Sequence, residues 1–225
     1  TLGAGVALGD VVAEVEKLLA DYPAPDGVDL EVGGTVEDQG DAFGDLGTLL
    51  ILIVILVYIV MATQFESLKF PFIIMFTIPF AFTGVFLALW MTSTPLSLIA
   101  LIGAIMLVGI VTKNGIVMVD YMNLLIERGS GVFDAVIAGG KSRLRPVLMT
   151  SFTTILGMLP LAIGTGAGSE TWQPMGIAVI GGLTFSTILT LFIVPVLYSI
   201  LVNRSQRKER EKLARLSAEH QASKH

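Results

Sequence analysis

The chain has 225 residues, of which 53% are hydrophobic and only 15% are charged, and its mean hydropathy is +0.79. Soluble domains average roughly 45–50% apolar and about 25% charged residues, so this composition excludes an ordinary soluble protein. The formal net charge of -5 combines an acidic amino-terminal region with a basic carboxyl-terminal tail. The absence of cysteine excludes disulfides and thiolate metal sites. We therefore expect an integral membrane protein.

Residues 1–43 are predicted to form the end of an extracytoplasmic α+β domain. Five apolar residues are spaced as one face of a helix that Asp10 caps: Val11, Val12, Val15, Leu18 and Leu19. A turn signal, YPAPDG, leads to VDLEV, where alternating apolar and acidic residues predict a half-buried strand. Because about forty residues bury too little surface to fold alone, we expect this region to complete a larger domain of a longer protein.

Residues 44–203 are predicted to form an all-α membrane bundle. Five apolar segments are at least as long as the roughly 17 residues that the shortest membrane-crossing helices need. These predicted spans are about 46–65, 70–91, 97–126, 146–163 and 175–202. STPLS, which contains Pro95, separates the second span from the third, and the glycine-rich GTGAGSETWQP separates the fourth from the fifth.

Lysine and arginine residues near the span ends predict the orientation of the bundle, because they prefer the cytoplasmic side. They occupy alternate connections and the tail: Lys69, then Arg128, Lys141, Arg143 and Arg145, then Arg204, Arg207, Lys208 and Arg210. The intervening connections contain neither residue type. This pattern places the amino-terminal end outside and the carboxyl-terminal end inside. Residues 204–225 are interpreted as a basic cytoplasmic tail, either a solvated helix or a disordered end.

Lys113 stands halfway along the third predicted span, in VGIVTKNGIVMVD. A charge at that depth costs at least about 2.5–3.5 kcal/mol, so it should face a protein interior, paired with an acid or lining an aqueous path. Asp120 shares its helical face but lies about 10.5 Å along the axis, too far for direct contact. No other acidic residue falls inside a predicted span. The partner of Lys113 is therefore expected outside this sequence, and its role is either functional or a fixed ion pair that locks two helices.

Polar residues near Lys113 could line a hydrated track with it. Asn114 follows it directly, and the fourth span contributes several hydroxyl groups, Thr150 among them, although each alone is more often helix-packing glue. No phosphate-binding loop, His/Cys metal cluster or nucleophile–base pair occurs, and the histidines, His220 and His225, lie in the tail. We expect no cofactor, no nucleic-acid partner and no soluble-type enzyme activity.

Four segments carry a resemblance to a known family. They are MATQFESLKFPFIIMFTIPFAFTG, LIALIGAIMLVGIVTKNGIVMVDYMNLL, KSRLRPVLMTSFTTILGMLPLAIGTGAGSE and PMGIAVIGGLTFSTILTLFIVPVLYSIL. With the amino-terminal region they cover almost the whole chain to about Asn203, and RLRPVLMT followed by GMLPLA is the most specific match. The chain resembles the carboxyl-terminal part of a resistance-nodulation-division efflux permease, of the drug- and hydrophobe-exporting branch.

This resemblance implies a proton-driven exporter, a secondary active transporter of the bacterial inner membrane, in which residues 1–43 end a periplasmic porter subdomain. In that family a lysine pairs with two adjacent aspartates of the amino-terminal half, and proton binding there drives export. The motif match carries the relay onto Lys113, Asn114, Arg143 and Thr150. It also implies a homotrimer with a periplasmic adaptor and an outer-membrane channel. The aspartate-bearing helix is absent from this sequence, so we expect the chain alone not to pump.

Three alternatives remain open at this point. The chain could derive from a relative in the same superfamily that assists protein translocation, or from a structural membrane subunit in which Lys113 forms a fixed ion pair. Metal export within the family is the third, although no Met/His/acid cluster argues for it. The substrate itself is not readable, because the resemblance implies that missing periplasmic regions select it.

Overall fold

The computed structural model describes residues 14, 15, 17–19, 35–164 and 169–222. Its helices are α2 (Thr35–Gln64), α3 (Lys69–Met75), α4 (Thr77–Met91), α5 (Leu98–Glu127), α6 (Val132–Ile163) and α7 (Ser169–Ala222). Five helical segments, with α3 and α4 counted together, are long and apolar enough to cross a membrane. The predicted five-helix membrane bundle is thereby confirmed. Of the predicted α+β region, residues 1–43, the structure describes residues 14, 15, 17–19 and 35–43. All of these are helical, residues 35–43 as the start of α2, and the predicted strand lies outside the described residues.

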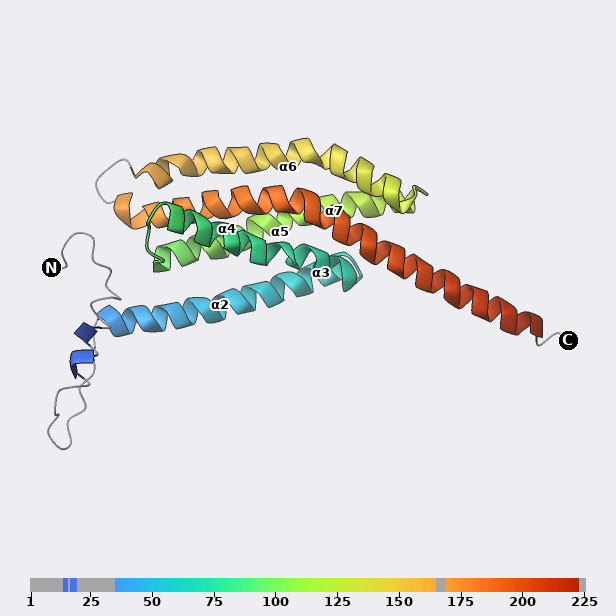
Figure 1. The fold of residues 1–225 in the computed structure, drawn as a ribbon, viewed down its shortest axis with the longest axis horizontal. Helices are drawn as coiled ribbons and strands as arrows, with labels where there is room; N and C mark the ends of the chain where they lie inside the picture. Colours follow the sequence, from blue (N-terminus) through green and yellow to red (C-terminus); the bar gives the residue numbers. More distant parts are fainter. Residues whose placement is uncertain (1–13, 16, 20–34, 165–168, 223–225) are drawn as a thin grey trace, which may run out of the picture.

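Successive candidate spans, with α3 and α4 forming one of them, run in opposite directions, side by side (Figure 1). The α2–α3 and α5–α6 connections lie at one end of the bundle, on the right in Figure 1, and the α4–α5 connection lies at the other. The lysine and arginine pattern predicts this alternation, since Lys69 and Arg128 belong to connections at the same end. Helix α7 continues beyond that end as a long extension. The side of the membrane on which each end lies stays a prediction.

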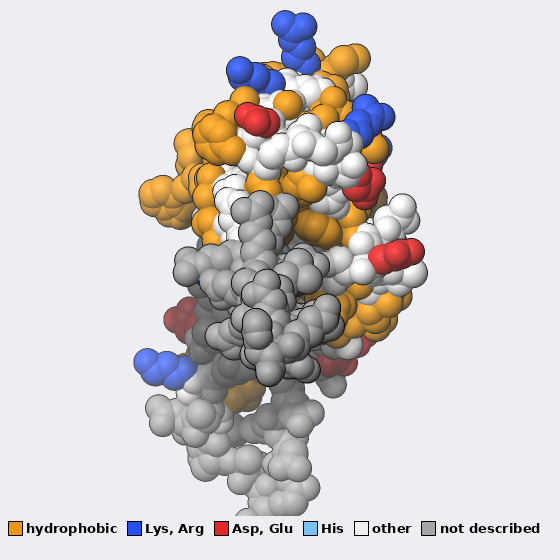
Figure 2. Space-filling view, turned by 90° about the vertical axis from the view of Figure 1, so that its right-hand side faces the viewer, with side chains coloured by type: hydrophobic (Ala, Val, Ile, Leu, Met, Phe, Trp, Pro, Cys, Tyr) orange, Lys and Arg blue, Asp and Glu red, His pale blue; other side chains and the backbone are white. Residues whose placement is uncertain are grey.

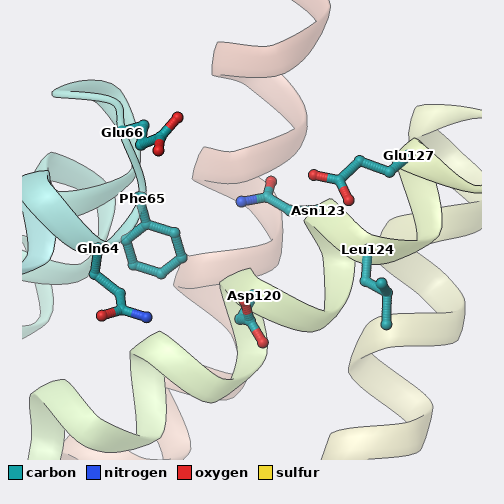
Figure 3. A pocket seen from close by; sticks show the side chains of 7 residues that line it. All are labelled: Gln64, Phe65, Glu66, Asp120, Asn123, Leu124 and Glu127. Atoms are coloured by element: carbon teal, nitrogen blue, oxygen red, sulfur yellow. The ribbon is translucent and has the colours of Figure 1, made fainter.

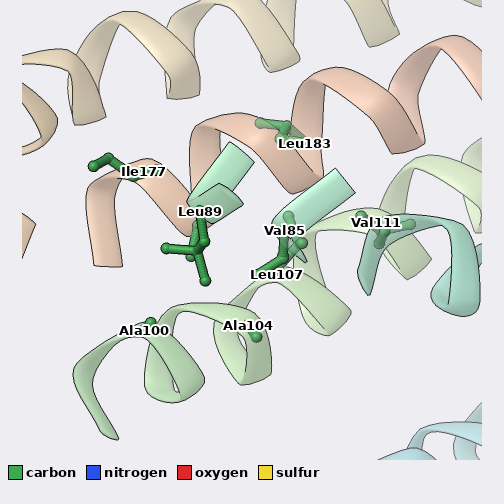
Figure 4. Packing of buried hydrophobic residues seen from close by; sticks show 10 residues of the cluster. Val85, Leu89, Ala100, Ala104, Leu107, Val111, Ile177 and Leu183 are labelled. Carbon is green, nitrogen blue, oxygen red and sulfur yellow. The ribbon is translucent and has the colours of Figure 1, made fainter. Parts of the chain in front are cut away.

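The main hydrophobic core lies between α4, α5 and α7 (Figure 4). Val85 and Leu89 of α4 project toward the α5 face that carries Ala104 and Leu107, and Leu183 of α7 closes the cluster. These side chains are at most 4% exposed. Small residues on α4, α5 and α7 let the three helices approach closely, which is how helices gain van der Waals contact in a membrane.

Glycines set the separation of α4 and α7. A Cβ atom added to Gly84 of α4 would stand 2.8 Å from the carbonyl oxygen of Gly181, and one added to Gly181 of α7 would overlap the side chain of Ala88 on α4. The obstacle at Gly84 includes backbone, which cannot rotate away as a flexible side chain can. We conclude that the contact between α4 and α7 depends on the lack of a side chain at these positions.

A second core cluster joins α2, α3, α5 and α7 toward the end that carries the basic connections. Tyr198 of α7 is fully buried in it, and its hydroxyl donates a hydrogen bond to Oδ1 of Asn123 on α5. The ring of Phe70 stacks on Tyr198 with centroids 5.6 Å apart. A buried tyrosine hydroxyl needs such a partner, because an unsatisfied polar group in this environment costs free energy.

Three helices begin earlier than the predicted spans. Helix α2 begins at Thr35, α6 at Val132 and α7 at Ser169, so part of the predicted GTGAGSETWQP loop is helical. Hydropathy locates the segment that fits in lipid, whereas a helix can continue into the charged residues beside it. Acidic residues in the first turns favour such extensions because they interact with the helix dipole, as Asp134 does in α6.

The second predicted span is interrupted at Phe76, which separates α3 from α4. Pro79 accounts for the interruption, because its ring removes one backbone donor and clashes with the carbonyl of the residue four positions earlier. The hydroxyl of Thr77 donates to the carbonyl of Ile74 at 2.6 Å and so satisfies one acceptor at the break. The two helices still continue in the same direction and form one candidate span, Lys69–Met91.

Helices α2 and α6 lie at the periphery. Only 6% of the most apolar window of α2 and 11% of that of α6 is buried, against 44–56% in the other three spans. The exposed side chains of α2 include Leu52, Ile55 and Ile59. These apolar surfaces are suited to contact with lipid or with further membrane helices, because both are apolar environments.

Replacing Gly84 with Ala is expected to lower the stability of the purified protein in detergent by about 1–3 kcal/mol, because the added Cβ meets the backbone of α7. Thermal unfolding followed by circular dichroism measures the change. The matched control is Gly157→Ala, since a Cβ at Gly157 meets nothing within 4 Å. The control should be neutral or stabilising by up to about 1 kcal/mol, because alanine is the better helix former. Equal effects of the two substitutions would refute the glycine argument.

Candidate functional site

Lys113 is exposed on the surface of α5, at a groove that α5 forms with α2. It stands about 22 Å from the start of the helix and about 21 Å from its end, at the usual helical rise. The groove here holds a cavity of about 340 Å³, and Lys113 is the single charged residue among the described residues that line it. The other lining residues are Leu56, Val57, Val60, Met61, Gly109, Thr112, Ile116 and Val117. Within this chain, the expectation that Lys113 faces a protein interior is not met.

A second cavity, of about 500 Å³, adjoins the first along the same groove. The two share Val60, Met61, Ile116 and Val117 in their linings. The second cavity adds Gln64, Phe65, Asp120 and Arg143. The sequence prediction that Asp120 shares the face of Lys113 is therefore confirmed, and α6 contributes Arg143 to the same groove.

Arg143 is held over an aromatic ring of α5. Its guanidinium carbon lies 4.5 Å from the centroid of the Tyr121 ring, which is cation–π geometry. Its Nε atom is buried and has no hydrogen-bond partner among the described residues. A buried donor of this kind needs an acceptor, and the cavity that Arg143 lines has room for water.

The groove ends in a third cavity, of about 280 Å³, at the end of the bundle that carries the basic connections (Figure 3). Gln64, Phe65 and Glu66 line one side, and α5 supplies Asp120 and Glu127 on the other, together with Asn123 and Leu124. Figure 2 looks onto this end and shows Lys, Arg, Asp and Glu side chains among hydrophobic patches. Asp120 lines both this cavity and the second one.

The other two residues of the predicted relay are placed differently. Asn114 is 7% exposed and faces the packed side of α5, and it does not line the cavity that contains Lys113. Thr150 is exposed, its hydroxyl donates to the carbonyl of Pro146 at 2.9 Å, and it lines none of these three cavities. The structure thus brings Lys113 and Arg143 to one groove and leaves Asn114 and Thr150 outside it. Their roles in a relay stay predictions.

Most neighbouring hydroxyls bond within their own helices, as the packing interpretation predicts. Thr112, Thr153 and Thr154 donate to carbonyls four residues earlier at 2.6–2.9 Å. Ser151 of α6 and Thr187 of α7 form a buried bond between helices, 2.9 Å long. Individually, these bonds stabilise the bundle, and of these residues Thr112 alone lines one of the three cavities.

Sequence reasoning missed two features of this region. No sequence pattern predicts that Tyr121 lies beneath Arg143, because an isolated tyrosine near a span end is common. The bond between Tyr198 and Asn123 joins residues 75 positions apart, and no local pattern reports it. Within the part of the chain that the structure describes, no group of three or more His, Cys, Asp or Glu residues could hold a metal ion.

Comparison with known proteins identifies the family. The model of the AcrB/AcrD/AcrF family matches residues 1–202. The chain belongs to this family. Its sequence is 37% identical over 199 residues to the swarming motility protein SwrC of Bacillus subtilis, a match that covers 88% of this chain and 19% of SwrC.

A metal resistance protein and a multidrug resistance protein match this chain at the same sequence identity. The cobalt-zinc-cadmium resistance protein CzcA of Cupriavidus metallidurans is 37% identical over 206 residues, which covers 91% of this chain and 19% of CzcA. The multidrug resistance protein MdtC of Erwinia tasmaniensis is 37% identical over 207 residues, which covers 92% of this chain and 20% of MdtC. The chain therefore spans about a fifth of the length of these relatives.

The fold matches part of a solved efflux pump. A crystal structure of a heavy metal efflux pump superposes with a TM-score of 0.78 at 29% sequence identity, over 88% of this chain and 20% of that one. A second crystal form gives a TM-score of 0.73 over 86% of this chain and 19% of that one. The arrangement of the helices is thus a family property.

The contact between Arg143 and Tyr121 is expected to stabilise the α5–α6 pair by about 0.5–2 kcal/mol. A double-mutant cycle of Tyr121→Leu and Arg143→Gln, read by thermal unfolding in detergent, measures this coupling. Tyr121→Phe is the matched control, because it keeps the ring that the guanidinium covers. A coupling energy indistinguishable from zero would contradict the interpretation.

Proposed function

We propose that this chain forms part of a proton-driven exporter of drugs or other hydrophobic solutes, and that Lys113 carries the positive half of its proton-coupling site. The observation that carries the proposal is the position of Lys113, exposed at mid-span beside a cavity whose other described lining residues are uncharged. Family membership supports it, because the names of related proteins include a cation efflux system protein, a heavy metal efflux pump and a multidrug resistance protein.

An ammonium group at this depth requires a partner. A lysine near a helix end can extend its side chain so that the ammonium group reaches the membrane surface. Lys113 cannot do so, because more than about 20 Å of helix separates it from either end of α5. Leaving the charged side chain of Lys113 in lipid would cost at least about 2.5–3.5 kcal/mol of free energy. We infer that a membrane helix outside this chain covers the groove and brings carboxylates to Lys113, as the family resemblance implies.

Such a pair can couple proton binding to a change of shape. The charge of Lys113 favours ionised carboxylates, whereas burial and repulsion between two carboxylates favour the bound proton. Protonation removes the attraction that holds Lys113, so the lysine is released and the helices around the groove repack. In the proposed relay, Arg143, Asn114 and Thr150 receive or stabilise the groups that move.

The proposed setting is the bacterial inner membrane, with the amino-terminal end periplasmic and the carboxyl-terminal end cytoplasmic. The loop charges support this orientation, since Lys69, Arg128 and Arg204 belong to the same end of the bundle. We propose a homotrimer that works with a periplasmic adaptor and an outer-membrane channel. The partner surfaces for those proteins are expected outside the residues described above.

Replacing Lys113 with Met in the permease that contains this chain is expected to reduce proton-dependent export to the level of cells without the protein. Methionine keeps the length of the side chain and removes its charge, so insertion becomes easier while coupling is lost. Accumulation of a fluorescent substrate, with and without an uncoupler, measures export. The matched control is Met106→Leu, two turns earlier on the same exposed face. Full proton-dependent export by Lys113→Met would refute the proposal.

Metal export is the second candidate, because CzcA matches at the same identity as MdtC and the fold superposes on a heavy metal efflux pump. Expression of the permease that contains this chain, in a drug- and metal-sensitive Gram-negative host, distinguishes drug export from metal export. We expect raised resistance to amphiphilic cationic dyes and unchanged resistance to cobalt, zinc and cadmium. The reverse pattern would assign the chain to metal export, and the Lys113→Met variant serves as the inactive control in both assays.

A further inference from the structure

We propose that Asp120 is a proton carrier that connects the Lys113 site to the aqueous phase at the end of the bundle with the basic connections. This inference rests on the proposed function and names a residue that the relay carried over from the family does not contain. It follows from the course of the groove between α2 and α5 rather than from any sequence motif.

The three cavities of the groove adjoin one another in sequence. The first and second share four lining residues, Val60, Met61, Ile116 and Val117, and the second and third share Gln64, Phe65 and Asp120. Lys113 lines the first, Arg143 the second, and Glu66 and Glu127 the third. Asp120 is the one carboxylate among the described lining residues that reaches two of them. It therefore stands at the junction between the inner and outer parts of the groove.

The spacing along α5 suits a relay with one intermediate stop. Asp120 lies two turns from Lys113, about 10.5 Å along the axis, which is too far for direct transfer but short enough for a few bridging waters. Glu127 at the end of α5 lies a further two turns on and is exposed. A carboxylate partway through the apolar length of a span is costly in lipid, which favours a hydrated and functional setting for Asp120.

Arg143 gives a reason for a carboxylate at this junction. Its Nε atom is buried without a hydrogen-bond partner among the described residues, and its guanidinium is fixed over Tyr121. A fixed positive charge repels an excess proton in the water of the second cavity. A carboxylate beside it offsets that charge and accepts the proton as a neutral acid.

The transfer is balanced and needs no co-reactant. A proton that leaves the Lys113 site passes through water to a carboxylate oxygen of Asp120, which becomes a carboxylic acid. The acid then releases the proton to water in the third cavity, and the carboxylate is restored. The charged groups that face Asp120 are Arg143 from α6, Glu66 from the α2–α3 connection and Glu127 from α5 itself; the facing residue of α2, Gln64, is uncharged.

The test measures export by the full permease in everted membrane vesicles, where the cytoplasmic face meets the buffer. Asp120→Asn is expected to lower the maximal rate about tenfold or more, as expected when a proton-transfer group is lost, with the KM for substrate unchanged. Asp120→Glu should restore at least half of the rate, and should change its dependence on the buffer pH. The matched control, Asp134→Asn, removes an exposed acid near the start of α6 that lines none of the three cavities, and should keep the parent rate.

The outcomes separate this inference from the proposed function. Full export by Asp120→Asn together with loss of export by Lys113→Met would overturn the role of Asp120 and leave the proposed function standing. Full export by Lys113→Met would overturn the proposed function itself. If Asp120→Asn does not accumulate in the membrane, Asp120→Ser takes its place, because a small hydroxyl fits the site. A raised KM at an unchanged maximal rate would likewise overturn the proton-carrier role.

Discussion

The charge of Lys113 in the middle of an apolar helix is the constraint on which the rest of this account depends. The four other spans contain no Asp, Glu, Lys, Arg or His residue at comparable depth in the predicted apolar segments, so α5 alone carries a charge that must be kept in contact with something polar. Its opposite face is packed against α4 and α7, and the Lys113 face opens on the groove beside α2. The helix thus separates a rigid side from a side that is available for a charged partner.

The rigid side has a clear physical origin. Glycines at the α4–α7 contact bring the backbones together, and buried small side chains of α5 fill the remaining space. Tyr198 and Asn123 add a specific polar link between α5 and α7 near one end. Because the glycine contacts and the core cluster between α4, α5 and α7 include none of the residues that line the groove, a change of charge at Lys113 can move the groove and its lining helices without unfolding this core.

The sequence predicts the spans well and the site only in part. The bounds of α5 agree with the predicted span to within a residue, because Ser97 caps its start and Pro95 precedes it, and the side chain of Ser97 accepts a bond from the backbone of Ala100. The start of α6 was not predictable from hydropathy, since Lys141 and Arg145 lie in a helix that extends past the apolar segment. The shared face of Lys113 and Asp120 follows from helical periodicity.

The contribution of Arg143 to the groove, unlike the shared face of Lys113 and Asp120, could not be predicted from the sequence. It depends on how α6 packs against α5, and no local pattern contains that information. The exposure of Lys113 also differs from the sequence expectation of an enclosed charge. Sequence and structure both indicate, however, that Lys113 requires a partner from outside this chain. The sequence lacks an acid at the depth of Lys113, and the groove beside Lys113 is open.

The central claim is that protein, rather than lipid, covers the groove at Lys113. A spin label at Val117→Cys tests it most directly, because Val117 lines the groove and this chain contains no native cysteine. The measurement is the collision rate of the label with oxygen in the assembled permease, relative to a lipid acyl-chain label at the same depth. We predict a rate well below that of the lipid label. A rate equal to it would show direct contact with lipid and would contradict the account.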